Sequence, residues 1–351
     1  MIDKIDVRDM TGMARREIIP ISVLVEVCYT CNQNCVHCCL GSHAKKGLRL
    51  DQYRQLFVQL AQAGTFFVIL TGGEPFTRPD FLDIVKAARK QRLSVTIFTN
   101  GTLLIPSIIS ELKALYVQEV HVSIYSANPE IHDSITGMPG SFQTSTDNIQ
   151  RMLDEGIGVR IKCPLMNRTA DGLEKLKRLA RDLGVMIQFT NVITAKNNGD
   201  SSTHQLRLTK EQLGSLLADG EAFPYAREPV HFKDNMDCTP CDTVFNGGAI
   251  DPCGNVYPCN QWQVKGGNVL ETPFLEIWRN APEFVELRNM RLRHLKQCGT
   301  CDLFEFCSRC PGLAMLEDGD LCGCSEAAKS LAEVRRGLDI YPTQSNIFSK
   351  I

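Results

Sequence analysis

The chain has 351 residues, 43% of them hydrophobic, and a formal net charge of -2, so it can bury a sizeable core as one large domain or two ordinary ones. The weak net charge and the lack of a Lys/Arg run argue against a nucleic-acid partner. No run of about 18 apolar residues marks a membrane span, and the charged N-terminus lacks the apolar segment of a secretory signal, so we expect a cytoplasmic protein without a membrane partner.

Short apolar, β-branched runs alternate with helix-period segments from residue 20 to about residue 192, a pattern typical of βα units around a parallel sheet. Six strands are expected, at residues 21–27, 66–70, 94–98, 119–125, 158–163 and 185–190. Six βα units are too few for the closed eight-stranded barrel. They leave a partial barrel or an open doubly wound sheet as the α/β fold.

Polar residues at alternate strand positions favour the partial barrel. They are Thr96, Asn100, His121, Ser123, Tyr125, Arg160, Lys162, Gln188 and Thr190. In a sheet covered by helices on both faces, such groups would be buried and unpaired at a cost of roughly 1–3 kcal/mol each, whereas in an open lumen they could contact a ligand. The alternative is that some of them simply lie at strand ends.

Two of the intervening helices have clear ends. Asp51 is expected to cap a helix that stops at Gly64, and a second helix, with Leu173 and Leu176 on its buried face, is expected to stop at Gly184.

The pattern changes after residue 192, where a polar loop and one helix lead into a Gly/Pro/Cys-rich region at about 230–325. We expect this region to be too irregular to build an apolar core without bound metal. The chain is therefore divided into an N-terminal extension (1–20), a barrel (21–215), a linker with a cysteine-rich domain (216–335) and a tail (336–351).

The chain contains 16 cysteines, which indicate metal binding rather than disulfides because the cytosol keeps thiols reduced. Among those that follow the first expected strand, Cys31, Cys35 and Cys38 have the spacing CxxxCxxC. The carboxyl end of a barrel strand is where such folds build their sites. Three thiolates on one loop suit a [4Fe-4S] cluster with one iron left without a protein ligand, although a zinc knot or a closed electron-transfer cluster that includes Cys28 would use the same residues.

This cysteine loop resembles that of the radical S-adenosylmethionine (SAM) superfamily. The resemblance implies that the fourth iron chelates SAM, and that an electron from the reduced cluster cleaves SAM to a 5′-deoxyadenosyl radical, which abstracts a hydrogen atom from a substrate. It also implies an electron donor such as flavodoxin or ferredoxin. His37, inside the loop, stands where the superfamily commonly has a residue near the adenine.

The sequence "TGGEP" at 71–75 resembles the GGE motif of the superfamily, which holds the methionine amino group of SAM. Gly72 and Gly73 would let the backbone approach a ligand, and Glu74 can accept a hydrogen bond from an ammonium group. By the same resemblance, Asn100 and Ser123, at the ends of the third and fourth strands, are expected near the ribose and the carboxylate of SAM. Asn-Gly is also an ordinary turn, which is the alternative for Asn100.

Strand parity suggests further residues inside the barrel. Tyr125, Arg160 and Lys162 are candidates for substrate contact, and the two cations could equally pair with the SAM carboxylate. Tyr125 or Cys163 is the candidate hydrogen donor to a product radical.

The C-terminal region carries two cysteine motifs. Cys241, Gly254 and Cys259 fit Cx12Gx4C, and residues 298–310 fit Cx2Cx5Cx2C. Together they resemble the SPASM extension of radical SAM enzymes, which carries two auxiliary iron-sulfur clusters. That resemblance implies two ligand sets, namely Cys241, Cys259 and Cys310 for the first cluster and Cys298, Cys301 and Cys307 for the second.

The chain departs from the SPASM pattern at two points. Cys307 and Cys310 are spaced Cx2C where the family has Cx3C, and Lys329 stands near the usual last cysteine. Cys322 or Cys324 is expected to supply the missing ligand of the second cluster, unless that cluster has an unusual ligand or an open iron. Cys238 or Cys253 is expected to complete the first, and two zinc-ribbon sites are the alternative.

Enzymes of this type mostly modify gene-encoded peptides or proteins, and the sequence resembles peptide maturases of the pyrroloquinoline-quinone and mycofactocin type. We therefore expect a peptide or protein that is crosslinked, epimerised or oxidised. A small metabolite, such as a tetrapyrrole or sugar precursor, is the alternative. Because only about 20 residues precede the first strand, we expect either that a partner protein brings the peptide leader or that the substrate is not a peptide. A non-catalytic iron-sulfur or zinc protein would leave Glu74 and the polar lumen without a purpose.

Overall fold

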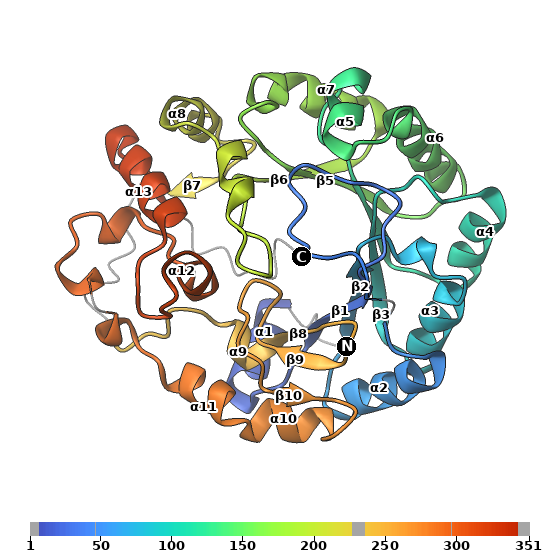
Figure 1. Ribbon diagram of the computed structural model, residues 1–351, viewed down its shortest axis with the longest axis horizontal. Coiled ribbons are helices and arrows are strands. Elements are labelled where there is room, and N and C mark those ends of the chain that lie inside the picture. The colour runs from blue at the N-terminus through green and yellow to red at the C-terminus, as the bar shows by residue number, and fades with distance from the viewer. Residues whose placement is uncertain (1–6, 46, 227–235, 296, 343–351) are drawn as a thin grey trace, which may run out of the picture.

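A computed structural model describes residues 7–45, 47–226, 236–295 and 297–342 (Figure 1). All six expected strands are present, each within two residues of its expected bounds. They are β1 (Ser22–Cys28), β2 (Phe67–Gly72), β3 (Ser94–Thr99), β4 (Glu119–Ser123), β5 (Val159–Pro164) and β6 (Met186–Thr190). The helices between them are α2 (Leu50–Gln62), α3 (Phe81–Lys90), α4 (Pro106–Ala114), α5 (Pro129–Thr136), α6 (Ser141–Asp154) and α7 (Leu173–Leu183).

The six strands pair in sequence order and in parallel, and their helices cover the outer face of the curved sheet (Figure 1). Val23, Val25 and Val27 of β1 are fully buried under these helices. The β-branched side chains fit the pleated strand, and burying each contributes roughly 1.5–3 kcal/mol. The predicted partial barrel is confirmed.

The inner face of the sheet is polar, as the alternation of the sequence predicts. In β5, Val159, Ile161 and Cys163 are buried, whereas Arg160 and Lys162, which alternate with them, are partly exposed. Neighbouring strands continue this polar row, because Ser123 of β4 pairs with Lys162. Several polar side chains therefore meet inside the barrel.

The predicted C-terminal ends of the two helices are correct, and the backbone conformation of the two glycines explains them. Gly64 and Gly184 both have positive φ, of 88° and 69°, the left-handed conformation in which glycine costs least. The cap expected at Asp51 is wrong. Arg49 is the N-cap of α2, and Asp51 lies in its first turn, where it accepts hydrogen bonds from the Arg49 guanidinium.

The cysteine-rich region extends the barrel sheet. Three of its strands, β8 (Gly247–Ile250), β9 (Asn255–Tyr257) and β10 (Gly267–Asn268), follow β1 on its free side, so that the sheet has nine strands in the order β10-β9-β8-β1-β2-β3-β4-β5-β6. β8 runs parallel to β1, and β9 and β10 are antiparallel hairpin strands. The two parts of the chain therefore share one sheet.

The cysteine-rich region contributes residues to the main apolar core, and the expectation that bound metal organises it stays a prediction. Phe274 and Trp278 of α10 (Phe274–Asn280) and Phe284 of α11 (Pro282–Asn289) are fully buried. Their rings lie 5.6–6.3 Å apart and join the main core, because the i, i+4 spacing of Phe274 and Trp278 places both rings on one face of α10.

The remaining described elements are α1 (Val7–Glu17), α8 (Lys210–Ala218), β7 (Tyr225–Ala226), α9 (Thr243–Asn246), α12 (Pro311–Asp318), α13 (Glu326–Leu338) and β11 (Tyr341–Pro342), with short 3-10 helices at 75–77, 170–172, 202–206, 292–294, 298–300 and 304–306. In Figure 1, α12 and α13 lie on the opposite side of the molecule from α3 and α4. Among the described helices, none is long and apolar enough to cross a membrane. The division into four segments stays a proposal.

Candidate active site

A cavity of about 350 Å³ lies at the carboxyl ends of the barrel strands. Its walls come from the cysteine loop after β1, from the ends of β2, β3 and β4, and from residues 192–197 beyond β6. The C-terminal region closes one side through Asn260, Gln261, Gln263 and Leu316. A volume of this size can hold a small organic cofactor.

Cys31, Cys35 and Cys38 all line this cavity. Burial, followed by the charges of Cys31 and Cys38, raises the pKa of the Cys35 thiol to about 12, and burial also raises the pKa of the other two. Their thiolates would therefore form only when a cation binds. The three thiols interact electrostatically, and sulfur donors suit iron. Among the described residues, no three His, Cys, Asp or Glu side chains gather closely enough to hold a single metal ion.

Gly72 and Gly73 are needed for packing against the cysteine loop. A Cβ built on Gly72, whose φ is 145°, would lie 2.1 Å from the Cys28 carbonyl oxygen, and a Cβ on Gly73 would lie 2.3 Å from the Thr30 carbonyl oxygen. The backbone N–H of Gly73 also donates to Cys28 O at 2.8 Å. Both glycines line the cavity, but their close neighbour in this structure is the loop backbone. From the sequence alone, these two glycines were expected to let the backbone approach a ligand, and that role stays a prediction.

Glu74 lies behind the cavity wall and is fully buried. Its carboxylate accepts hydrogen bonds from the Thr99 hydroxyl at 2.8 Å, from the Asn100 backbone N–H at 2.7 Å and from the Phe76 N–H at 3.1 Å. Burial raises the pKa of Glu74 to about 7, and these donors oppose that rise. Glu74 therefore joins the ends of β2 and β3. Its expected contact with the SAM amino group stays a prediction.

Asn100 and Ser123 line the cavity, as the sequence predicts for the ends of β3 and β4. The Asn100 side chain donates to Asn32 Oδ1 at 2.8 Å and accepts from the Thr102 N–H at 2.9 Å. It thereby forms the Asn-Gly turn and also holds the cysteine loop. The turn expected for Asn100 is therefore present, and its expected position near SAM stays a prediction.

His37 and Tyr125 form the aromatic wall of the cavity, with ring centroids 4.5 Å apart in an edge-to-face arrangement. Burial lowers the pKa of His37 to about 4, so its ring is neutral at physiological pH. Tyr125 packs against Cys35, and its hydroxyl interacts with Cys35 and Ser123. A hydrogen-donor role for Tyr125 stays a prediction.

Three of the predicted barrel residues do not line the cavity. Arg160 pairs with Glu119 at 3.3 Å, and Lys162 lies 3.8 Å above the centroid of the Phe98 ring. Cys163 is buried on the helix side of β5, with its thiol toward Tyr125 O at 3.8 Å. Their expected roles toward SAM and substrate stay predictions, and these contacts do not support them.

The first auxiliary set of cysteines comes together as the SPASM resemblance implies. Cys259 interacts electrostatically with both Cys241 and Cys310, and burial is the main cause that raises the pKa of all three, to about 11 for Cys241. The Cys310 thiol lies 3.9 Å from Gln261 Oε1, and Gln261 lines the cavity. This set is therefore one residue away from the cavity.

The second set gathers around the short helices at 298–300 and 304–306. Cys307 interacts with Cys298, Cys301 and Cys324, and burial, its largest cause, raises its pKa to about 12. Cys324 also interacts with Cys301 and with Lys329, and Cys322 interacts with Cys298. Both candidates for the missing ligand thus lie in this set, and Cys324 is the one that faces its three other members.

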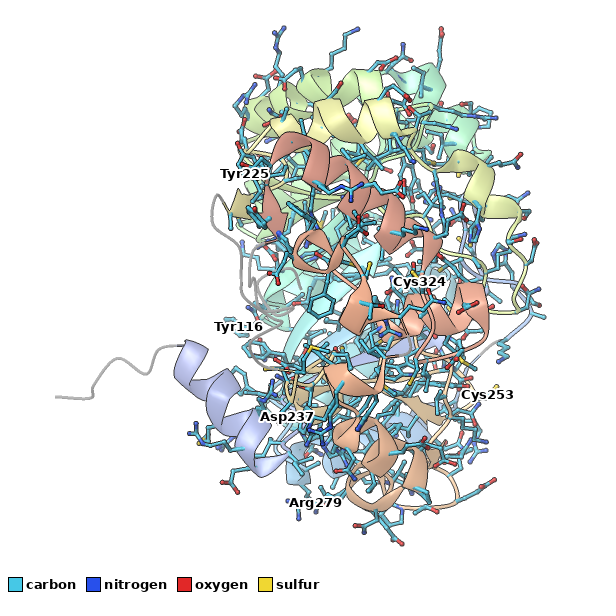
Figure 2. All side chains as sticks on the ribbon, turned by 90° about the vertical axis from the view of Figure 1, so that its left-hand side faces the viewer. Tyr116, Tyr225, Asp237, Cys253, Arg279 and Cys324 are labelled. Atoms are coloured by element: carbon cyan, nitrogen blue, oxygen red, sulfur yellow. The ribbon has the colours of Figure 1, made fainter. Side chains whose placement is uncertain are left out.

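The two candidates for completing the first set differ in burial. Cys253 is exposed in the turn between β8 and β9, and Figure 2 shows it at the edge of the molecule. Cys238 is partly buried and packs against the main apolar core, where its carbonyl accepts from the Leu292 N–H. Their ligand roles stay predictions.

Sequence reasoning missed two polar residues of the cavity, Glu26 and Tyr29. The Tyr29 hydroxyl donates to Glu26 Oε2 at 3.0 Å, and both side chains line the cavity. Glu26 faces inward on β1 between buried valines, an alternation that the apolar run around it concealed.

Comparison with known proteins agrees with this geometry. Residues 25–180 match the family model of the radical SAM superfamily, and residues 241–311 match that of an iron-sulfur cluster-binding domain of the SPASM type. The chain is 30% identical over 331 residues to the AdoMet-dependent heme synthase of Methanosarcina barkeri, covering 86% of this chain and 94% of that one. It is 29% identical over 309 residues to the mycofactocin maturase MftC of Mycobacterium tuberculosis, covering 82% and 77%.

The fold is also found among solved structures. Streptococcus suis SuiB, solved with the precursor peptide SuiA, superimposes with a TM-score of 0.68 at 15% identity, covering 91% of this chain and 79% of that one. The SAM-binding cluster and the auxiliary iron-sulfur clusters are properties of the two matched families, and the thiol sets described above fit them in chemistry. The chain therefore belongs to the radical SAM superfamily and is an enzyme of its SPASM subgroup.

Proposed function

We propose that this enzyme abstracts a hydrogen atom from a residue of a peptide or protein, so that the residue is crosslinked, epimerised or oxidised. The observation that carries the proposal is the composition of the cavity wall. The wall contains Cys31, Cys35, Cys38 and the neighbouring Cys39, together with amide side chains from both parts of the chain. No Lys or Arg is found among the described residues that line it.

The amide groups suit a peptide backbone. Asn197 lies on the barrel side of the cavity, and Asn260, Gln261 and Gln263 lie on the C-terminal side. Each amide can both donate to a carbonyl and accept from an N–H, which is what an extended peptide presents. The likeness to mycofactocin maturase supports the same class of substrate.

A tetrapyrrole precursor is the second candidate, because the M. barkeri heme synthase is matched over 94% of its length. Such a substrate carries several carboxylates, and buried carboxylates require cations or several hydrogen-bond donors. The described cavity lining instead contributes the carboxylate of Glu26. The peptide is therefore the better supported substrate.

The residues divide into three binding roles under this proposal. Cys31, Cys35 and Cys38 would hold the [4Fe-4S] cluster, which supplies the electron that cleaves SAM when it is bound. The ends of β2, β3 and β4 would hold SAM. The side of the cavity formed by the C-terminal region would hold the substrate, next to the first auxiliary set. A flavodoxin or ferredoxin would deliver electrons, and a separate protein would present the leader of the peptide.

The test is anaerobic reconstitution of the wild type and of a Cys31, Cys35, Cys38→Ala triple variant. We expect about 12 irons per chain in the wild type and about 8 in the variant, with 5′-deoxyadenosine formed from SAM and dithionite by the wild type alone. Zinc in place of iron, or 5′-deoxyadenosine that is unaffected by the triple change, would show that the proposal is wrong.

The substrate class is tested on the same wild-type enzyme. Short peptides encoded next to the gene, and separately a tetracarboxylate porphyrin precursor, are added with SAM and reductant. A peptide substrate should increase 5′-deoxyadenosine formation and change the mass of the peptide. Stimulation by the porphyrin alone would transfer the assignment to the second candidate.

A further inference from the structure

Three cationic side chains and one carboxylate act on the second cysteine set, the carboxylate being Asp318, which accepts from the Cys324 N–H at 3.2 Å. Arg309 faces Cys298 and Cys324, Arg335 faces Cys307, and Lys329 faces Cys324. Lys329 is exposed, so solvent screens its charge. The two arginines are partly buried, and among the described residues neither forms an ion pair with a carboxylate.

Arg309 ties the second set to the first. It directly precedes Cys310, and its Nε and Nη2 donate to Gly323 O at 3.1 and 2.8 Å, while Nη2 also donates to Leu321 O. These carbonyls flank the two cysteines at 322 and 324. The third edge of the guanidinium, Nη1, is buried without a hydrogen-bond partner. A buried, uncompensated cation of this kind is costly unless an anionic group lies beside it.

Arg335 of α13 has the same incomplete surroundings. Its Nη1 donates to Phe306 O at 3.2 Å and to the Ser308 hydroxyl at 2.7 Å, whereas its Nε is buried without a hydrogen-bond partner. Burial lowers the pKa of Arg335 to about 10, and the neighbouring Cys307 opposes that change. An anion beside this guanidinium would fit both the unpartnered Nε and the nearby Cys307.

The first set has a different electrostatic environment. Asp242 lies beside Cys241 and Glu317 lies beside Cys310, and both acids raise the pKa of the adjacent thiol. These acids pair with Arg15 and Arg207, so their charges are already compensated. Arg309 reaches this set only at Cys310.

Four thiolates around a [4Fe-4S] core of charge 2+ leave a net negative charge, which grows when the cluster is reduced. Nearby positive charge and N–H donors aimed at the sulfurs therefore favour the reduced form. We propose that Arg309 and Arg335 supply the charge that makes the second auxiliary cluster easier to reduce than the first. This inference depends on the proposed function, because it requires both clusters to be present.

The experiment is an EPR-monitored redox titration of the reconstituted enzyme in the Cys31, Cys35, Cys38→Ala background, where only auxiliary clusters remain. Removing one set at a time with Cys241→Ala or Cys307→Ala assigns the signals. We expect the second cluster to have the higher midpoint potential. Arg335→Gln should lower the potential of the second cluster alone, and Arg309→Gln should lower both, the second by more.

Arg336→Gln is the matched control. Arg336 is the next residue on α13, carries the same charge, is exposed and pairs with Asp302, so its removal should leave both potentials unchanged. Arg335→Lys should restore most of the shift that Arg335→Gln causes. If Arg335→Lys retains the iron content of the parent, the shift in Arg335→Gln reflects the lost charge and not a folding defect.

The possible failures can be told apart. Absence of iron and sulfide in the triple-alanine background would overturn the proposed function and this inference with it. Two clusters of normal iron content whose potentials are the same in Arg335→Gln, Arg336→Gln and the parent would overturn the inference alone. Loss of iron in Arg309→Gln together with unchanged potentials in Arg335→Gln would show that these arginines only hold loops.

Discussion

The side-chain amide of Asn100 donates a hydrogen bond to Asn32 Oδ1 at 2.8 Å, which joins the end of β3 to the cysteine loop. The same amide accepts from Thr102, so its orientation is fixed. We expect Asn32→Ala and Asn100→Ala each to destabilise the protein, and the double variant to be less destabilised than their sum, by about 1 kcal/mol. Urea denaturation of the four proteins in this cycle measures that coupling. Strict additivity would show that the contact contributes nothing.

Gly73 allows β2 to end directly against the cysteine loop. In Gly73→Ala the new Cβ would meet the backbone carbonyls of Thr30 and Tyr29 at 2.3 and 2.5 Å, and backbone cannot give way as a flexible side chain can. We expect a loss of about 2 kcal/mol or more in unfolding free energy, because the loop must shift. The thermal melting temperature and the iron bound by the loop should both fall.

Gly172→Ala is the control for that prediction. Gly172 precedes α7 with a φ of −92°, and a Cβ there would meet nothing within 4 Å. Its stability should stay within about 0.5 kcal/mol of the wild type. Equal losses in the two variants would contradict the role assigned to Gly73.

The raised pKa of Glu26 predicts that the stability of the protein depends on pH. Burial raises its pKa from 4.5 to about 7, the Tyr29 hydroxyl and Lys45 oppose the rise, and Asp251 adds to it. The folded state therefore holds the proton more tightly than the unfolded state. Its contribution to stability is complete below about pH 4.5 and is lost as the pH rises through about 7.

Glu26→Gln removes this titration. Between pH 5 and 8 the stability of the wild type should fall by roughly 2 kcal/mol relative to that of Glu26→Gln, measured on the metal-free protein by urea denaturation. Glu286→Gln, which changes an exposed acid on α11, should show no comparable fall relative to the wild type. A constant difference for Glu26→Gln would mean that Glu26 is not buried as described.

The barrel could be predicted from sequence because its signals are local. Apolar runs such as that of β1, and glycines such as Gly184 at a helix end, depend on backbone preferences within a few residues. The thiol motif could also be found, because its spacing places three cysteines on one loop. Side chains at strand ends, such as Asn100 and Ser123, then follow from the rule that barrel sites lie at the carboxyl ends.

Other features depend on contacts between distant parts of the chain. The pairing of β1 with β8 joins residues more than 200 positions apart, and no local sequence pattern predicts this pairing. Strand parity correctly put Arg160 and Lys162 on the inner face. It could not show that Arg160 pairs with Glu119 and that Lys162 lies over the Phe98 ring. Likewise, the contact of Gly73 with the cysteine loop needed the position of both segments in space.

Cys322 and Cys324 provide the sharpest test of the second cluster, since they are two residues apart and only one is expected to bind iron. Cys324 interacts with Cys298, Cys301 and Cys307, and Cys322 interacts with Cys298. Figure 2 shows Cys324 beside the C-terminal helices. We expect Cys324→Ser to lose up to four irons per chain and Cys322→Ser to retain them. The reason is that an iron-sulfur cluster prefers soft thiolate ligands, and the serine hydroxyl is a hard, weak ligand for it. Iron and sulfide analysis after anaerobic reconstitution gives the result.

The reverse pattern would make Cys322 the fourth ligand. Full iron content in both single variants but not in Cys322, Cys324→Ser would mean that either thiol can complete the cluster, so that the loop carrying them, rather than one cysteine, determines the site.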